Sequence, residues 1–307
     1  MRIGRVAGAT DTGRRRVRNE DAYVCAPPLF AVADGMGGAR AGEIAARLAA
    51  AALEEVDAGA LGQDGMEALI AEANRRIWER AVSDPTTAGM GTTVTAALVD
   101  AARGHVTVGH VGDSRAYLVR GDSLEQLTTD HSLVAELVQS GVLTPEEAER
   151  HPQRSAITRA LGTEPTVEVE SFTVEAIPGD LFLLCSDGLS VMLADGEILE
   201  AIDRSERDPA AAADALVAAA NARGGEDNVT VVLFELVEGE ARDGEALSVS
   251  MTTTDRAESV PLERTEPAAD GDLRTHGAGP GGRAAALLLV VGLVALALLV
   301  LYLAVAR

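Results

Sequence analysis

The stretch Leu29-Phe30-Ala31-Val32-Ala33-Asp34-Gly35 is an apolar, β-like run that stops at an aspartate followed by glycine. The same join of an apolar run to an aspartate recurs three times: Val106–Gly112 leads into Asp113, Leu181–Ser186 leads into Asp187, and Asp227 comes just before Val229–Phe234. Strand ends are rigid, and carboxylates that converge there repel one another strongly unless cations lie among them. The pattern therefore predicts a hard-metal site built on a β-sheet.

The four aspartates offer oxygen ligands only, and the histidines of the chain lack metal-ligand spacing. Oxygen-only ligation suits Mg²⁺ or Mn²⁺ rather than Zn²⁺. Gly35 and Gly188 each follow one of the aspartates; glycine permits a tight turn there and leaves a backbone carbonyl accessible as a further ligand. A single Asp-Gly pair is usually a plain turn. Repetition in one strand-end context favours the metal site.

The charge composition excludes several functions. The net charge is −22, and all 26 basic residues are arginine. Without lysine the chain can form neither a phosphate loop of the G-x-x-x-x-G-K type nor a Schiff base. The acidic balance argues against nucleic-acid binding, which needs a basic surface. Cys25 and Cys185 lack C-x-x-C spacing, so neither a zinc site nor a disulfide framework is expected. We expect a reducing, cytosolic setting instead.

The composition divides the chain into three parts. Residues 1–238 form the predicted globular domain. Residues 239–283 are rich in Gly, Pro, Thr, Asp and Glu and predict a flexible, disordered linker. Residues 284–306 are uncharged and apolar throughout and predict one transmembrane helix, since such a run spans roughly 30 Å. No export signal precedes the domain, so we expect a single-pass protein of the cell membrane with a cytoplasmic catalytic domain.

The globular part is expected to combine helices with a largely antiparallel sheet. Helical periodicity covers about 42–56, 66–82, 133–139 and 210–221, and β-like runs cover 92–99, 106–111 and 116–119 besides the two late strands. Neighbouring strands are joined by short turns, which is typical of antiparallel pairing. The helices come in blocks rather than after each strand. This favours an α+β fold with helical layers over a sheet or sheets.

Arginines precede a carboxylate pair in Gly13-Arg14-Arg15-Arg16-Val17-Arg18-Asn19-Glu20-Asp21. The planar guanidinium of arginine is suited to binding phosphate. Cations together with an arginine would neutralise a phosphate dianion, and a water held between two cations becomes a nucleophile because its pKa falls. The block therefore points to phosphate chemistry at the predicted metal site.

Six blocks in order resemble the metal-dependent serine/threonine phosphatases of the protein phosphatase 2C type, in their bacterial form. The blocks are Arg16-x-x-Asn19-Glu20-Asp21, Val32–Gly38, Gly91-Thr92-Thr93, Val111–Arg115, Cys185–Leu189 and Asp227–Thr230. Each block is weak by itself, but all six in the family's order are very specific, and the similarity covers about residues 3–236. The resemblance implies an αββα sandwich, in which two antiparallel sheets are flanked by helix pairs and metals lie at one end between the sheets.

The resemblance also implies a role for each matched residue. Asp34 would bridge two Mn²⁺ or Mg²⁺ ions, Gly35 would give its carbonyl to one of them, and Asp187 and Asp227 would ligate the other. Asp113 with Asp187 matches a third, weaker ion position. Glu20 and Asp21 would hold metal-bound waters, and Arg16 would bind the phosphate.

One residue departs from the animal members of the family, which carry a histidine after Asp-Gly. Met36 stands there in this chain, so the acid that protonates the leaving group is unassigned, with a metal-bound water as the first choice. The stretch Leu137–Ser155 matches the family's mobile flap, which would select substrates or gate the metals. His151 lies in the flap; a surface position is favoured for it over one beside the substrate.

The function expected is hydrolysis of phosphoserine or phosphothreonine in proteins by metal-activated water, without a covalent phosphoenzyme. By resemblance the partners would be phosphorylated proteins, including Hanks-type Ser/Thr kinases and their substrates. An alternative is a regulatory phosphatase of a partner-switching pathway that acts on anti-anti-sigma proteins, although no sensor domain is visible. A catalytically dead scaffold is disfavoured because every matched ligand is present. A dinucleotide site fails because Arg40 stands where its pattern needs glycine.

Overall fold

The fold is described here from a computed structural model, which covers residues 1–37, 41–55, 63–148, 150–239 and 249–254. The expected transmembrane segment 284–306 and most of the expected linker lie outside these ranges. Within the described ranges, no helix has both the length and the apolar character needed to cross a bilayer.

Two β-sheets form the centre of the globular domain. One has the strand order β13-β1-β12-β11-β8-β9, and the other has the order β10-β7-β6-β3-β2. The first sheet consists of β13 (Val249–Thr254), β1 (Arg2–Asp11), β12 (Val229–Val237), β11 (Leu181–Cys185), β8 (Arg115–Arg120) and β9 (Ser123–Gln126). The second consists of β10 (Glu170–Glu175), β7 (His105–Val111), β6 (Val94–Asp100), β3 (Leu29–Ala33) and β2 (Ala22–Ala26). A short ribbon pairs β4 (Gly35–Met36) with β5 (Gly91–Thr92).

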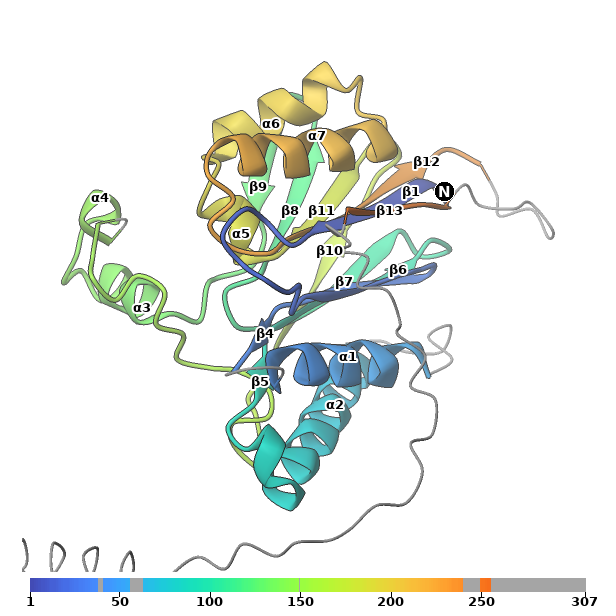
Figure 1. The fold of residues 1–307 in the computed structure, drawn as a ribbon. Coiled ribbons are helices and arrows are strands. Elements are labelled where there is room, and N and C mark those ends of the chain that lie inside the picture. The colour runs from blue at the N-terminus through green and yellow to red at the C-terminus, as the bar shows by residue number, and fades with distance from the viewer. Residues whose placement is uncertain (38–40, 56–62, 149, 240–248, 255–307) are drawn as a thin grey trace, which may run out of the picture. The chain divides into compact units, whose positions relative to one another are not determined.

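Helix pairs cover the outer faces of the two sheets, which gives four layers (Figure 1). The pair α1 (Ala41–Glu54) and α2 (Gln63–Ser83) packs on the sheet that contains β3 and β6 through one apolar cluster. The pair α6 (Asp195–Arg204) and α7 (Pro209–Ala222) packs on the sheet that contains β11 and β12 through a second. A third cluster fills the space between the sheets, with Phe234 stacked between Phe30 and Phe182. The αββα arrangement of the globular domain is therefore confirmed.

The strongly periodic segments were predicted well. The expected helices correspond to α1, α2, α7 and α3 (Leu133–Gln139), and the apolar runs became β3, β7, β11 and β12. Among the strands of the described ranges, every pair is antiparallel except β13 with β1, which is parallel. The sheets are thus largely antiparallel, as expected.

Strand β13 departs from the expectation of a disordered linker over 239–283. Val249–Thr254 pairs along β1 from Val6 to Asp11, so this part of the stretch is an ordered edge strand. Val249 and Met251 of this strand are exposed, so burial of apolar side chains contributes little to it; the strand is held by backbone pairing with β1. The strands β1 and β10 and the helix α6 were also absent from the sequence prediction.

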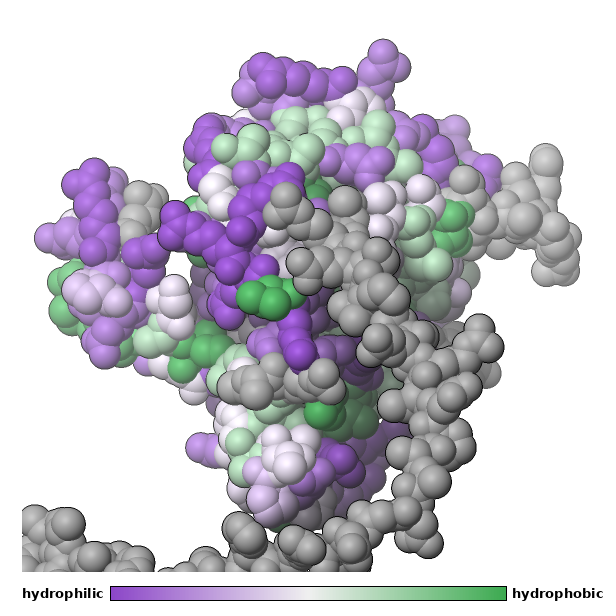
Figure 2. Space-filling view, in the orientation of Figure 1, coloured by the Kyte–Doolittle hydropathy of each residue, from purple (hydrophilic) through white to green (hydrophobic). Residues whose placement is uncertain are grey.

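The segment with α3 and α4 (Pro145–Ala148) projects from the body of the domain (Figure 1). The helix α3 leads into the flap, and its N-cap Ser132 accepts a hydrogen bond from the amide of Ala135 at 3.3 Å. Gly141, at φ 73°, lies between the two helices. In the space-filling view, hydrophilic residues predominate on the upper side of this segment, and apolar residues lie along its lower side and the adjoining surface (Figure 2). Two further short helical turns are η2 (Pro85–Thr87) and α5 (Asp187–Ser190).

Candidate active site

Both sheets contribute an aspartate pair to the site. Asp34 and Asp113 follow β3 and β7 of one sheet, whereas Asp187 and Asp227 adjoin β11 and β12 of the other. Burial raises the pKa of Asp34 well above its usual value, and the nearby charges of Asp21, Asp187, Asp113 and Asp227 raise it further. The structure therefore brings all four strand-end aspartates to one place.

The carboxyls of this cluster compete for protons. Asp187 shares a hydrogen bond with Asp34, and burial together with the charge of Asp227 raises the pKa of Asp187 to about 6. Burial and the charge of Asp187 raise the pKa of Asp113 to about 7. Buried like charges favour protonation when no cation is near. Divalent cations would replace those protons, and an oxygen-only donor set suits Mg²⁺ or Mn²⁺.

Arg16 lies at the open side of the cluster. Its Nη2 is 2.6 Å from Oδ2 of Asp227, and its side chain is 52% exposed. The loop that carries it is held by the amides of Arg14 and Arg15, which both donate to the carbonyl of Gly225. Gly13 has φ 79°, and a Cβ there would lie 2.1 Å from the carbonyl oxygen of Asp227. The loop thus places one guanidinium at the rim of the acidic cluster.

Asp21 is buried behind the cluster. Its Oδ2 accepts hydrogen bonds from Thr230 Oγ1 at 2.6 Å and from Ser186 Oγ at 2.9 Å. Its Oδ1 has no hydrogen-bond partner among the described residues. Burial raises the pKa of Asp21 to about 7. A buried carboxylate oxygen without a protein partner indicates a place for a polar ligand or ordered water.

Glu20 and its neighbours connect the N-terminal loop to β12. The amide of Glu20 donates to Oδ1 of Asn228, and Nδ2 of Asn228 donates to the carbonyls of Thr12 and Arg18. Burial raises the pKa of Glu20, although the charge of Arg16 opposes this. Asn228 is therefore the residue that fixes Glu20 and the arginine loop beside the cluster.

The two site glycines are required by close approach rather than by a positive φ. A Cβ on Gly35 would lie 2.3 Å from the carbonyl oxygen of Gly42 and 2.4 Å from that of Glu20. A Cβ on Gly188 would lie 2.0 Å from the carbonyl oxygen of Asn228. Any side chain would push these backbones apart. The tight-turn explanation from the sequence is thus replaced by a packing one.

Several hydroxyl residues brace Asp34, and sequence reasoning assigned them no role. Thr93 Oγ1 accepts the amide hydrogen of Asp34 at 3.0 Å and lies 2.7 Å from Ser114 Oγ. Thr92 Oγ1 donates to the carbonyl of Asp34 at 2.8 Å. The two threonines stand out in the block Gly91-Thr92-Thr93, just before β6. Their hydrogen bonds to Asp34, however, join segments that are distant in the sequence, so their role could not be predicted.

His151 makes a local contact in the flap. Its Nδ1 accepts the amide hydrogen of Gln153 at 3.2 Å. No contact between its ring and the aspartate cluster is present among the described residues. A surface position for His151 remains the better interpretation.

The metal-free protein is expected to lose thermal stability as the pH rises from about 5 to about 8. The pKa values of Asp21, Asp113 and Asp187 are raised to about 7, 7 and 6 in the folded state, against roughly 3.9 when unfolded. The folded state then binds more protons than the unfolded state, so stability falls as pH rises through these values. Melting in a chelator should show a decrease of roughly 5–10 °C. A melting temperature that rises over this range would contradict the assignment.

The comparisons with known proteins agree with this geometry. Residues 14–224 match the family model of protein phosphatase 2C. The chain is 42% identical over 238 residues to the serine/threonine phosphatase stp of Listeria innocua, which covers 74% of this chain and 93% of that protein. The crystal structure of the Mycobacterium tuberculosis serine/threonine phosphatase PstP/Ppp is similar with 42% identity and a TM-score of 0.73, over 77% of this chain and 100% of that one. A PstP catalytic domain in complex with 2 manganese ions is similar with 40% identity and a TM-score of 0.71, over 77% and 99%.

Proposed function

The chain belongs to the protein phosphatase 2C family and is a serine/threonine protein phosphatase, and on that premise we propose that its strand-end aspartates hold the divalent cations of the reaction. Asp34 would bridge two Mn²⁺ or Mg²⁺ ions, with the Gly35 carbonyl on one and Asp187 and Asp227 on the other. Asp113 and Asp187 would hold a third, weaker ion. The observation that carries the proposal is the convergence of half-buried carboxylates from the strand ends of both sheets, where burial and the charges of the other aspartates raise the pKa of Asp34.

The residues present fit such ions. The donors are carboxylate and carbonyl oxygens, and the unpartnered Oδ1 of Asp21 adds an acceptor next to them. Bound divalent cations would neutralise the cluster and the phosphate and would lower the pKa of a water molecule that serves as nucleophile. Glu20 and Asp21 would accept hydrogen bonds from water in the site.

Arg16 would bind the phosphate of the substrate. Its guanidinium now contacts one oxygen of Asp227, at 2.6 Å. A phosphate offers the paired oxygens that a guanidinium binds best. If the Arg16 guanidinium exchanged its contact with Asp227 for one with the phosphate, that Asp227 oxygen would become free to face a cation.

The nucleophilic side chains close to the cluster are not suited to form a covalent phosphoenzyme. Cys185 is fully buried, and burial raises the pKa of its thiol to about 12. The hydroxyl of Ser186 donates to Asp21 and accepts the amide hydrogen of Thr230. The thiol of Cys185 stays protonated and the hydroxyl of Ser186 is hydrogen-bonded, so neither is free to attack phosphorus. Direct attack by water is therefore the reaction that the site supports.

The substrates would be proteins that carry phosphoserine or phosphothreonine, including Ser/Thr kinases and their targets. A direct test is phosphate release from a phosphothreonine peptide by the full chain, with Mn²⁺ and with a chelator. Release is expected only with the cation. Equal rates under the two conditions would refute the metal-dependent mechanism.

We further propose that Ala284–Ala306, which lies outside the described residues, anchors the protein in the cell membrane with the catalytic domain in the cytoplasm. The support is the uncharged apolar length of this segment. After cell fractionation the full chain should sediment with membranes, whereas a chain that ends at Arg283 should not. A full-length protein in the soluble fraction would rule out the anchor.

A further inference from the structure

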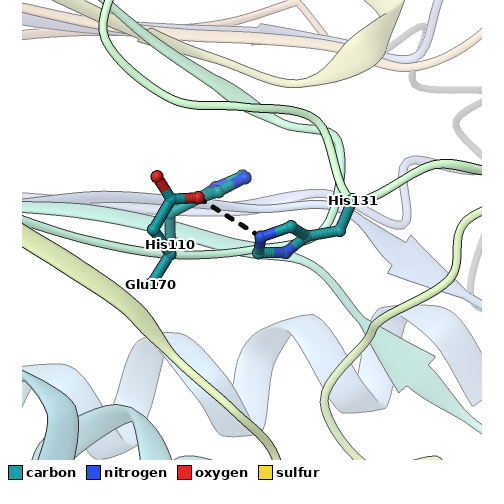
Figure 3. Close-up of side chains that lie close together, drawn as sticks. All are labelled: His110, His131 and Glu170. Carbon is teal, nitrogen blue, oxygen red and sulfur yellow. Dashed lines mark ion pairs between the residues drawn. The ribbon is translucent and has the colours of Figure 1, made fainter. Parts of the chain in front are cut away.

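A second group of titratable side chains lies beside the aspartates, and the proposed reaction does not use it. Among the described residues, His110, His131 and Glu170 form a group whose ligand atoms all lie within 4.8 Å of one another. Nε2 of His131 is 3.3 Å from Oε2 of Glu170. Figure 3 shows the imidazole of His131 and the carboxylate of Glu170 directed toward each other. Two histidines and a glutamate are a common ligand set for zinc, so a metal site has to be considered first.

The hydrogen bonds of His131 argue against a metal at this group. Its Nδ1 accepts the amide hydrogen of Gly112 at 3.1 Å. In a neutral imidazole with Nδ1 as acceptor, Nε2 carries the proton. A metal-ligating histidine has the opposite arrangement, in which the other ring nitrogen donates a hydrogen. His131 is held neutral, since burial and the charge of Arg159 lower its pKa to about 4. With Nδ1 occupied by the Gly112 amide, Nε2 carries the hydrogen and faces Oε2 of Glu170, with Nη1 of Arg159 3.4 Å away, so no lone pair is left for a cation.

His131 instead holds the peptide that precedes Asp113. Its backbone amide donates to the carbonyl of Gly112 at 2.7 Å, while its ring accepts from the amide of the same residue. Gly112 has φ 115°, and a Cβ there would lie 2.5 Å from Thr93. The peptide is thus held by two hydrogen bonds with His131 and packs closely against Thr93. Its neighbour in the chain is the carboxylate assigned to the weaker cation.

The imidazole of His110 supports the same loop from β7. The two histidine rings lie 4.7 Å apart, and Nδ1 of His110 is 2.9 Å from Thr95 Oγ1. Thr95 Oγ1 is in turn 2.9 Å from the carbonyl oxygen of Ser114. The residues on both sides of Asp113 are therefore tied, directly or through Thr95, to the histidine pair.

His131 also marks the point where the flap joins the domain. Its carbonyl accepts the amide hydrogen of Thr158 at 2.8 Å, and the amide of Leu133 donates to the carbonyl of Ala156 at 2.9 Å. The segments that enter and leave the flap are thus joined by an isolated β-bridge between Ser132 and Ile157, next to His131. A single residue consequently contacts the loop before Asp113 and the base of the flap.

We propose that His131 is a positioning residue for the cation at Asp113: its ring Nδ1, as acceptor from the Gly112 amide, sets the direction of the Asp113 carboxylate. This inference rests on the proposed assignment of Asp113 as a ligand of the weaker ion. Loss of the ring acceptor leaves the Gly112 amide without its partner and lets the loop reorient. The core cations would be held by Asp34, Gly35, Asp187 and Asp227, and among the described residues no hydrogen bond or ion pair joins His131 to any of these.

Two substitutions separate the ring atoms of His131. Asparagine places an acceptor oxygen near the position of Nδ1, whereas glutamine places its amide near the position of Nε2. His131→Asn should therefore keep the bond from Gly112 and lose the contact with Glu170. His131→Gln should do the reverse. Glu170→Gln, which removes only the carboxylate charge at the far end, is the matched control.

The test is calorimetric titration of the full chain with Mn²⁺, combined with hydrogen exchange of the Gly112 amide. His131→Gln is expected to weaken the weaker Mn²⁺ site roughly 10-fold or more and to speed exchange at Gly112, with the tight sites unchanged. His131→Asn and Glu170→Gln are expected to stay within about 2-fold of wild type, since neither breaks the Gly112 bond. Thermal melting establishes that each variant is folded.

The outcomes that would overturn the proposal are distinct. Wild-type affinity in a folded His131→Gln protein, or equal weakening in His131→Gln and His131→Asn, would show that the ring acceptor does not position Asp113. If His131→Gln does not fold, loss of the weaker site in His131→Asn still overturns it. If Asp113→Ala leaves the weaker site unchanged, the assignment of Asp113 itself is wrong, and the proposal for His131 falls with it.

Discussion

The Asp34→Asn variant is expected to lose on the order of a thousandfold or more in kcat toward a phosphothreonine peptide. The bridging carboxylate would hold both core cations, which supply several kcal/mol of transition-state stabilisation, and about 1.4 kcal/mol is tenfold in rate. Asparagine has the size of aspartate and keeps the backbone bonds of residue 34 to Thr92 and Thr93. The loss should therefore come from the missing charge and not from unfolding.

Stability provides an internal control for this variant. Burial and the neighbouring carboxylates raise the pKa of Asp34 well above its usual value, so its ionised form is unfavourable without cations. A neutral amide removes that repulsion. Without metal, Asp34→Asn is thus expected to melt at a higher temperature than wild type at pH 8. Functional sites commonly carry such a stability cost.

Asp113→Asn is the comparison that tests the division among the ligands. It would disturb only the weaker ion, and we expect a loss of roughly tenfold, or about 1.4 kcal/mol of transition-state stabilisation. Both variants should be measured at saturating Mn²⁺. Equal losses for Asp34→Asn and Asp113→Asn would show that the proposed core pair and weaker site are not distinct.

The Arg16→Ala variant is expected to lower kcat/KM by roughly 10- to 100-fold, mainly through a higher KM. Hydrogen bonds to charged groups contribute about 1.5–3 kcal/mol, which corresponds to that range. Arg16→Lys should recover part of the loss, because it keeps the charge but not the paired donors. Arg18→Ala is the matched control, since Arg18 is exposed in the same loop and touches the site through its backbone carbonyl. A similar loss in Arg18→Ala would show that Arg16 acts only through the general positive charge of the loop and has no specific phosphate-binding role.

The elements that could be predicted are those whose sequence carries its own periodicity. The run before Asp34 is buried at every position and reads as a strand without further context. Strand β1 includes Gly4, Gly8 and two arginines, so its apolar pattern is interrupted; its place in the sheet comes from pairing with β12. Strand β13 depends likewise on the edge of β1, which lies far away in sequence. Tertiary pairing outweighed local composition in both cases.

The site divides in the same way. The aspartates could be predicted because each lies beside an apolar run, and the Arg16 block because it is contiguous. Two contacts of the site join segments that are remote in the chain: Arg16 with Asp227, and His131 with Gly112. No local sequence pattern predicts them. The roles of His110 and His131 could not be predicted, because hydrogen bonds to a remote hydroxyl, carbonyl or amide have no sequence signature.

Anomalous diffraction at the manganese edge, from crystals of the protein grown with Mn²⁺, tests the central assignment most directly. We predict strong peaks on both sides of the Asp34 carboxylate, within reach of Asp187, Asp227 and the Gly35 carbonyl, and a weaker peak beside Asp113. The absence of a peak at Asp34, or a strongest peak between His131 and Glu170, would contradict it.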